Sequence, residues 1–529
     1  MKLVIACLVV VLNSAHTYKL TWDSERHLLD ETIRRPYSLT DDPDYMKQRE
    51  KMIADEDAMR LGGRLVLQPE EQAVNKILMA EKTKMMDDSR INRTPYIPSL
   101  SFYQVKPKVE NTTLLKLIRQ MPKGGALHVH DLSGASIDWL IQNATYRDNI
   151  YMCVDPDSYI LFKAFKTPPP NPDCPWKSVK EERAAASSPQ AFDALLKKNL
   201  TMLEVDPVEA YPNNDKAWIR FQKFFMQVYY LIYYVPVFRD YYRRTLEEFS
   251  ADNVQYLELR AQLWGLYDLE GKVYDSEFGL NLLLNVTEEF KKVNPNFIGA
   301  KVIMCGIRNS NVSVIAENVK NAVALKQLYP DFLAGYDLVS DEVWYNPLIY
   351  YLDALLYPSR MDPPYDLPYF FHAGETDWQG TEVDKNLVDA ILLNTTRIGH
   401  GFALSKHPNL AKVVRTRQIG VEVNPISNQL LRLVTDLRNH PMNGLLAQDY
   451  PIVISSDDPS VWESYPLSHD FYMAFMAMSS EDADLTFLKQ LAINSIRYSA
   501  MSKSERKAAT AKWEQSWSTF IKTYLSQRP

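Results

Sequence analysis

The sequence contains little cysteine and no excess of positive charge. Four of its 529 residues are cysteine, and 66 Asp and Glu outnumber 59 Lys and Arg, for a formal net charge of −7. A protein whose main partner is nucleic acid needs a basic face to neutralise phosphates, so this balance argues against that class. Internal repeats, low-complexity tracts and a GxGxxG loop are also missing. A chain of this length forms about two to four domain-sized units, or one large barrel with additions.

Long apolar runs are missing beyond the first residues. Leu3 to Leu12 is almost wholly apolar, follows Lys2 and is followed by small residues up to Ala15. This pattern is typical of a signal peptide and predicts one over residues 1–15. A buried N-terminal strand or helix is the alternative. Because no later segment has enough uninterrupted apolar residues to span a bilayer, we expect a secreted, extracellular protein without a membrane span.

The remaining cysteines and the glycosylation sequons agree with export. Cys153 and Cys174 flank a Pro-rich loop and are the plausible disulfide pair. Cys305 lies in an apolar run, and we expect a buried free thiol there. Seven Asn-x-Ser/Thr sequons are glycosylation candidates in a secreted protein. They begin at Asn92, Asn111, Asn143, Asn199, Asn285, Asn311 and Asn394.

Composition divides the mature chain into four regions. Residues 16–100 are charged and helix-prone, and their default role is packing or oligomerisation. Residues 101–131 lead into the first histidine motif. Residues 132–215 hold the cysteine pair, a Pro-rich stretch and two sequons, which indicates an inserted surface subdomain. Residues 216–529 alternate short apolar runs with amphipathic stretches.

That alternation predicts the fold class. Helical patterns lie between most of the short, β-branched or aromatic runs, as at 278–293, 311–328 and 385–393. The predicted strands are 125–130, 254–260, 300–307, 332–338, 369–372, 397–401, 420–424 and 452–456. Eight strands alternating with helices favour an α/β fold with a parallel sheet closed as a (β/α)8 TIM barrel. An open doubly wound sheet is the alternative.

Histidines end two of the predicted strands in patterns that suit a metal. His128 and His130 are two residues apart in a strand, so both imidazoles point the same way, into the barrel mouth. His372 ends the fifth strand, and Glu375 follows in the turn. Each motif alone also fits a structural role, with a histidine bonded to a backbone carbonyl or Glu375 capping a helix.

Two further strand ends carry titratable side chains. His400 ends the sixth strand between two glycines, which allow a close approach to its ring. Asp457 and Asp458 follow the eighth strand, where adjacent carboxylates are costly unless a cation or another partner compensates them. The alternatives are a tight turn around His400 and a helix start at Asp458-Pro459.

Taken together, these side chains predict a zinc-dependent hydrolase. Three imidazoles and one carboxylate bind Zn²⁺ while leaving room for water, whose pKa the ion lowers towards neutrality. A nearby His orients or deprotonates that water, and a Glu protonates the leaving side. The active site of a barrel lies at the carboxyl ends of its strands, where all four motifs fall. We therefore expect one Zn²⁺ per chain.

Five segments, in order, resemble the adenosine deaminase family: MPKGGALHVHD, HAGE, TTRIGHG, EVNPISN and SSDDP. The resemblance covers nearly the whole mature chain and is specific to the purine deaminases. The long N-terminal segment, the insertion and NLVDAILLNTTRIGHGFAL look more like the secreted adenosine deaminase-related growth factors. Deaminases that flip bases use a His/Cys/Cys or Cys₃ zinc site. This chain has no CxxC pair, which excludes that other deaminase fold as the source of the chemistry.

The resemblance implies a role for each motif residue. Glu375 would protonate purine N1, His400 would orient or deprotonate the attacking water, and Asp458 would hydrogen-bond purine N7. Asp131 looks like a sugar-hydroxyl contact, and Trp218 looks like a residue that closes the ribose pocket. The alternatives for these two are a solvated turn residue and a buried structural tryptophan. The implied zinc ligands are His128, His130, His372 and Asp457.

One position departs from the family pattern. The fourth strand of the family usually ends in a glycine whose backbone N–H meets the purine, and Ser340 stands there in this sequence. A backbone N–H survives the change. The extra hydroxymethyl group puts the depth of the pocket and the purine preference in question.

The resemblance implies extracellular deamination of adenosine and 2′-deoxyadenosine, combined with growth-factor activity. Residues 16–100 would form a homodimer, and residues 132–215 would bind a cell-surface receptor or glycan. One alternative is a receptor-binding growth factor that uses the barrel as a scaffold, although the filled ligand positions favour catalysis. Another is an AMP deaminase or a two-metal amidohydrolase. The signal peptide and sequons disfavour the former, and a missing lysine at the end of the fourth strand disfavours the latter.

Overall fold

Eight parallel strands close into a barrel in the structure, a computed structural model that describes residues 42–204 and 206–527. Two four-stranded parallel sheets, β1-β5-β6-β7 and β11-β10-β9-β8, form its two halves. Parallel bridges between Tyr336 and Tyr369 and between Val129 and Asp457 join the halves on both sides. The predicted closed barrel is therefore confirmed, and the open sheet is excluded.

The strands lie where the apolar runs predicted them, within one or two residues at most ends. Their side chains are buried on both faces, as expected for a parallel sheet covered by helices. The predicted bounds differ most for the fifth strand, 369–372. Only a single bridge at Tyr369 precedes its short observed ladder at His372 and Ala373. The bounds are β1 Gly125–His130, β5 Tyr256–Ala261, β6 Gly299–Ile307, β7 Leu333–Val339, β8 His372–Ala373, β9 Arg397–His400, β10 Gly420–Val423 and β11 Ile452–Ile454.

Helices cover the outside of the barrel. α12 and α13 pack on β6, and α21 packs on β1 and β11. α12 begins where the Asp275 carboxylate accepts the backbone N–H of Phe278, a common helix start. The longer helices that follow barrel strands are α11 Val235–Ala251, α12 Ser276–Val293, α13 Val312–Leu328, α15 Asn386–Leu392, α16 Pro408–Arg417, α20 Ser468–Ala477, α21 Leu485–Arg497 and α22 Lys503–Ser526. Shorter elements are η3 Leu348–Tyr351, α14 Leu352–Leu355, η4 Pro358–Arg360, η5 Phe402–Lys406, α17 Pro425–Leu430, η6 Leu437–Asn439, α18 Asn443–Leu446 and α19 Pro459–Trp462.

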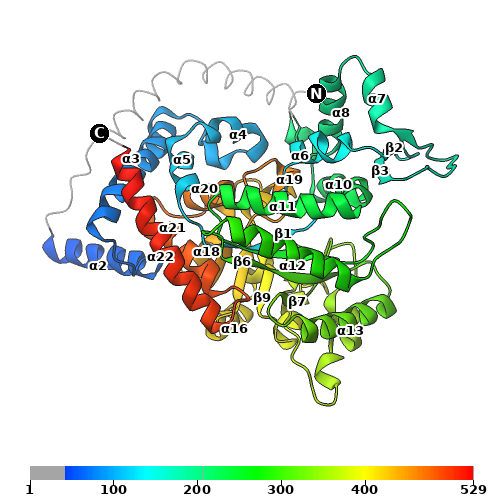
Figure 1. Cartoon of the computed structure of the whole chain (residues 1–529). Helices are drawn as coiled ribbons and strands as arrows, with labels where there is room; N and C mark the ends of the chain where they lie inside the picture. The colour runs from blue at the N-terminus through cyan, green and yellow to red at the C-terminus, as the bar shows by residue number, and fades with distance from the viewer. Residues whose placement is uncertain (1–41, 205, 528–529) are drawn as a thin grey trace, which may run out of the picture. The chain divides into compact units, whose positions relative to one another are not determined.

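The N-terminal region divides between two compact units, one ending at Asp57 and one comprising Ala58–Pro529. The first contains most of α2 (Pro43–Met59), which buries no residue. The second begins with α3 Pro69–Asn92, η1 Ile97–Ser99, α4 Phe102–Glu110 and α5 Thr113–Gln120. Figure 1 shows α3, in blue, beside the C-terminal α22, in red, and the two helices are in contact.

A buried carboxylate anchors α3 to the C-terminal helices. Glu71 accepts hydrogen bonds from Lys489 Nζ and Trp517 Nε1, both at 2.5 Å. Part of the predicted segment 16–100 therefore packs on the barrel unit, while its role in dimerisation stays a prediction. The predicted signal peptide lies outside the described residues. Nowhere in residues 42–204 or 206–527 is a helix both long and apolar enough to cross a membrane.

The predicted insertion forms its own small sheet after β1. Its three antiparallel strands are ordered β3-β2-β4, and the predicted disulfide between Cys153 and Cys174 is formed. Cys305 is a buried free thiol, also as predicted. β3 contacts α10 (Asn214–Ile232), the helix that returns the chain to the barrel. The elements are α6 Ile137–Gln142, η2 Ala144–Tyr146, β2 Ile150–Val154, β3 Ile160–Ala164, β4 Lys177–Ser178, α7 Val179–Ala185, α8 Pro189–Asn199 and α9 Pro207–Ala210.

The sequon asparagines lie at the surface. Asn199 is half-buried at the end of α8, and the other six are exposed. All seven candidates are thus at least partly accessible, and their glycosylation stays a prediction.

Candidate active site

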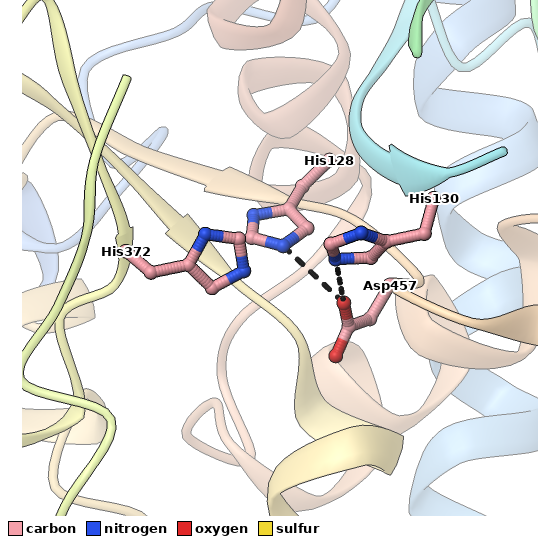
Figure 2. Close-up of side chains that lie close together, drawn as sticks. All are labelled: His128, His130, His372 and Asp457. Carbon is pink, nitrogen blue, oxygen red and sulfur yellow. Dashed lines mark ion pairs between the residues drawn. The ribbon is translucent and has the colours of Figure 1, made fainter. Parts of the chain in front are cut away.

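Four donor side chains meet at the carboxyl ends of three barrel strands. His128 and His130 belong to β1, His372 begins β8, and Asp457 follows β11. One ligand atom from each lies within 4.8 Å of the others. Asp457 Oδ1 is 3.2 Å from His128 Nε2 and 3.1 Å from His130 Nε2. Figure 2 shows the three rings and the carboxylate pointing towards one another. The structure thus brings together the four residues predicted as zinc ligands.

Unusual backbone positions allow this convergence. A Cβ on Gly399 would lie 3.1 Å from His372 Cα and 3.2 Å from His128 Cε1, so glycine leaves room for both histidines. Asp457 and His400 have φ angles of 60° and 58°, in the left-handed region that non-glycine residues rarely adopt. Such strain persists where surrounding contacts hold it, typically at functional sites.

Two buried carboxylates orient the ligand histidines from behind. Glu422 Oε2 lies 2.7 Å from His128 Nδ1, and Asp337 Oδ2 lies 2.7 Å from His372 Nδ1. A carboxylate only accepts, so each Nδ1 carries the proton and each Nε2 keeps its lone pair for the cluster. Burial lowers the pKa of His372 to about 3, although Asp337 acts in the opposite direction.

Two buried arginines hold those carboxylates in place. Arg260 bridges Asp337 and Glu422 at 2.8 and 2.7 Å. Arg397 bridges Glu422 and Glu258 at 2.5 and 2.6 Å. Burial alone would raise the pKa of Asp337 and Glu422, but the guanidinium and imidazole neighbours hold both below their ordinary values. The carboxylates therefore remain ionised acceptors beneath the cluster.

The donor set fits a zinc ion. Three imidazoles and one carboxylate are ligands that Zn²⁺ accepts, and carboxylates behind histidine ligands are usual in zinc sites. His128 Nε2 is fully buried and finds no hydrogen-bond partner among the described residues. A buried nitrogen lone pair in this position is costly unless something occupies the space in front of it. A metal ion satisfies that nitrogen and the Asp457 carboxylate together.

Glu375 and His400 face this cluster. The Glu342 carboxylate accepts the backbone N–H groups of Gly374 and Glu375 at 3.1 and 2.9 Å, which fixes the turn after β8. Glu375 Oε1 lies 3.4 Å from His400 Nδ1, and His400 Nε2 lies 3.7 Å from Asp457 Oδ2. Burial, reinforced by Asp457, raises the pKa of Glu375, which favours a protonated carboxyl. Burial lowers the pKa of His400.

A cavity of about 480 Å³ opens in front of these groups. It is lined by the other predicted substrate contacts, Asp131, Trp218, Ser340 and Asp458, together with aromatic side chains of α10. Asp131 accepts a hydrogen bond from the Tyr233 hydroxyl at 2.7 Å, and burial raises its pKa to about 6. Asp131 is therefore a buried wall residue, which disfavours the solvated-turn alternative.

The remaining predicted contacts occupy different walls. Asp458 accepts a hydrogen bond from the Ser133 hydroxyl, and burial next to Asp457 raises its pKa. Trp218 is buried on α10, its ring 5.2 Å from that of Phe221. Trp218 both lines the cavity and packs in the core. Its position is therefore compatible with a pocket-closing residue and with a buried structural tryptophan.

Ser340 lies at the end of β7 with a φ of 90°. That angle favours glycine, which explains physically why a glycine suits this position and why a serine there is strained.

The supporting residues were not predicted from the sequence. Charged residues inside apolar strands were the available signal, as in the Tyr-Leu-Glu-Leu-Arg run of β5 and the Val-Glu-Val run of β10. A charge in a buried strand needs a partner, but its partner lies on another strand and has no local signature. The missed residues are Glu258, Arg260, Asp337, Glu342, Arg397 and Glu422.

Comparison with known sequences agrees with this geometry. The family model described as adenosine deaminase matches residues 195–515, and that described as adenosine/AMP deaminase N-terminal matches residues 3–118. Adenosine deaminase 2 of Sus scrofa is 45% identical over 480 residues, covering 90% of this chain and 93% of that protein. Adenosine deaminase of Lutzomyia longipalpis is 41% identical over 518 residues, covering 97% and 98%.

Solved structures share the fold at low sequence identity. An arabidopsis N6-mAMP deaminase matches with a TM-score of 0.55 and 16% identity, covering 76% of this chain and 99% of that one. A cog1816 amidohydrolase from Burkhoderia ambifaria, with bound Zn, matches with a TM-score of 0.50 and 18% identity, covering 78% and 95%.

A closed parallel barrel with three histidines and an aspartate at its strand ends has the architecture and the donor set typical of metal-dependent (β/α)8-barrel enzymes. Within that class, the chain belongs to the adenosine deaminase family. The resemblance predicted from the motifs, the barrel fold and the enzyme class are thereby confirmed.

Proposed function

We propose that this protein is an extracellular enzyme that hydrolyses adenosine and 2′-deoxyadenosine to inosine and deoxyinosine, releasing ammonia, with one Zn²⁺ per chain. The observation that carries the proposal is the cavity at which the four-donor cluster faces Glu375 and His400. Its relatives named adenosine deaminase 2 and adenosine deaminase cover most of the chain and support the substrate.

Each side chain has a part in the reaction. A Zn²⁺ held by His128, His130, His372 and Asp457 would supply Lewis acidity that lowers the pKa of water by several units. Glu375, protonated in its buried position, donates its proton to purine N1 and makes C6 electrophilic. His400 orients or deprotonates the water that adds to C6. Asp458, whose pKa burial also raises, donates a hydrogen bond to purine N7. The amino group then leaves as ammonia.

The charges of the cavity favour a nucleoside over a nucleotide. Among the residues that line it, Arg260 carries the only lysine or arginine charge, and its guanidinium is bound to Asp337 and Glu422. A phosphate group would therefore meet no free cation there. Asp131 would instead accept a hydrogen bond from a sugar hydroxyl and would repel a phosphate. This argues against the AMP deaminase alternative.

The insertion and the export signals support a wider role. The small disulfide-linked sheet of residues 132–215 stands outside the barrel and is suited to bind a cell-surface receptor or glycan. The apolar N-terminal run and accessible sequons support secretion. We include homodimerisation through residues 16–100 and growth-factor activity in the proposal. A growth factor with an inactive barrel is the second candidate, and the complete donor cluster disfavours it.

The decisive test is loss of absorbance at the adenosine band with purified, zinc-loaded protein. Glu375→Gln should lower kcat by about 10²–10⁴-fold, since it removes the general acid. The matched control is Glu382→Gln, an exposed carboxylate paired with Lys385 shortly after the same turn. Chelator treatment should abolish turnover, and added Zn²⁺ should restore it. Absence of turnover with any adenine nucleoside would favour the scaffold alternative.

A further inference from the structure

A chain of buried hydrogen bonds reaches His400 from the side away from the ligand cluster. His440 Nε2 lies 3.0 Å from Asn428 Oδ1, and Asn428 Nδ2 lies 3.2 Å from His400 Nδ1. Asn428 belongs to α17, and His440 follows η6. All three side chains are at most 2% exposed, so these bonds are shielded from bulk solvent. The role of His400 therefore depends on which partner in each bond donates.

A backbone N–H at the far end of this series of hydrogen bonds determines which partner donates in each bond. The Met442 backbone N–H lies 3.1 Å from His440 Nδ1, and a backbone N–H only donates. His440 Nδ1 is therefore the acceptor, and its ring, kept neutral by burial that lowers its pKa to about 3, carries its proton on Nε2. That proton goes to the Asn428 carbonyl oxygen. The amide nitrogen of Asn428 consequently donates to His400 Nδ1.

We infer that Asn428 and His440 are positioning residues that hold His400 in the tautomer with its proton on Nε2. This inference rests on the proposed function, within which His400 either orients or deprotonates the attacking water. With a proton on Nε2, His400 presents an N–H donor to the side where Asp457 Oδ2 lies 3.7 Å away. Neutral His400 then orients the attacking oxygen by donating a hydrogen bond, and it is not the base.

A second asparagine supports this assignment. The Asn424 amide lies on the other side of the ring, with Nδ2 3.4 Å from His400 Nε2. Its Oδ1 is buried and finds no hydrogen-bond donor among the described residues. The oxygen and nitrogen of an amide are assigned from their hydrogen-bond partners. A half-turn of the Asn424 amide places Oδ1 instead of Nδ2 towards His400 Nε2, so an N–H on Nε2 faces no opposing donor there.

The opposite tautomer conflicts with the same neighbours. Glu375 Oε1, 3.4 Å from His400 Nδ1, is the group that would accept a proton placed on Nδ1. That proton would then face the Asn428 amide N–H, and two donors would oppose each other at 3.2 Å. Reversing the Asn428 amide would move the same conflict to His440 Nε2. Every donor in this series of hydrogen bonds faces an acceptor only when the proton of His400 is on Nε2.

The test is ¹⁵N NMR of the full-length protein labelled at its histidine ring nitrogens, with and without Zn²⁺. His400→Gln assigns the signals. In the wild type we expect an unprotonated Nδ1 and a protonated Nε2 at His400. Asn428→Asp replaces the amide by a nearly isosteric carboxylate that only accepts, so the proton should move to Nδ1. A wild-type spectrum with the proton on His400 Nδ1 would overturn the inference, whether or not Asn428→Asp folds.

Kinetics give an independent measurement. Asn428→Asp should lower kcat by about 10²-fold with little change in KM, since a hydrogen-bond donor to the attacking oxygen is lost. His440→Gln keeps an N–H towards Asn428 and should retain most activity, whereas His440→Phe should lose it. Equal losses in both His440 variants, with unchanged His400 signals, would indicate a merely structural role. A wild-type protein with the expected spectrum but no turnover would contradict the proposed function and leave the tautomer assignment intact.

Discussion

Histidines in two regions of the cavity have opposite kinds of hydrogen-bond partner. We call His128 and His372 with the carboxylates behind them the floor, and His400 with Asn428 the wall. On the floor, the Nδ1 atoms of His128 and His372 meet the carboxylates of Glu422 and Asp337 at 2.7 Å. On the wall, Nδ1 of His400 meets the amide of Asn428 at 3.2 Å. A carboxylate takes a proton in a hydrogen bond, whereas this amide supplies one. The difference leaves the floor histidines with a free lone pair on Nε2 and gives His400 an Nε2–H that donates a hydrogen bond.

The two regions also differ in electrostatic cost. The floor buries the three carboxylates of Glu258, Asp337 and Glu422 with the two guanidiniums of Arg260 and Arg397, a net charge of −1 from 3 negative and 2 positive groups. Buried charges are tolerated when each is paired and hydrogen-bonded. The residual negative charge beneath the cluster favours a cation above it. The groups that contact His400 from behind, Asn428 and His440, are neutral, and their burial costs less.

The largest expected effect comes from removing a floor histidine. His372→Asn should reduce bound Zn²⁺ well below one ion per chain and lower kcat by about a thousandfold or more, because the ion supplies several kcal/mol of the rate enhancement. Metal analysis and the adenosine assay measure the two effects. His407→Asn is the control, since His407 also meets a carboxylate, Asp384 at 2.8 Å, but lies outside the site. A His372 variant with full zinc content would contradict the ligand assignment.

A smaller effect is expected from weakening the carboxylate behind that histidine. Asp337→Asn removes a charge that Arg260 and His372 share, so zinc affinity should fall about 10–100-fold with the fold intact. Competition with a chromophoric chelator measures the affinity. Asp353→Asn, at an exposed carboxylate paired with Arg360, should leave it unchanged. Equal affinities in both variants would show that the carboxylate behind His372 does not support zinc binding.

The smallest effect is expected at Ser340, which supports neither histidine group. Ser340→Gly should stabilise the fold by about 1 kcal/mol, because glycine relieves the strain at a φ of 90° and loses part of that gain through its freer unfolded chain. The kcat/KM should change by less than about threefold, because the backbone N–H remains. Denaturant unfolding monitored by fluorescence measures the stability. A destabilised variant would show that the serine hydroxyl makes a compensating contact.

Local patterns predicted the barrel strands and the strand ends that carry the donor cluster, and the family resemblance singled out its four residues. Strand 125–130 was predicted at its observed bounds, because alternation and flanking turn residues are local signals. The convergence of His128 with Asp457 followed from the rule that barrel sites lie at strand ends. The partner of each buried charge could not be predicted. Glu422 lies 294 residues from His128, and nothing near either residue in the sequence indicates the other.

The amino-acid sequence by itself determined the barrel, the family and the residues available for chemistry, since these depend on short-range patterns and on motif identity. Only the tertiary structure decided what each histidine does. A histidine has two nitrogens, and its proton goes to whichever one faces an acceptor, so its role depends on neighbours brought together by folding. Glu422 and Asp337 behind the floor, and Asn428 beside His400, make that choice.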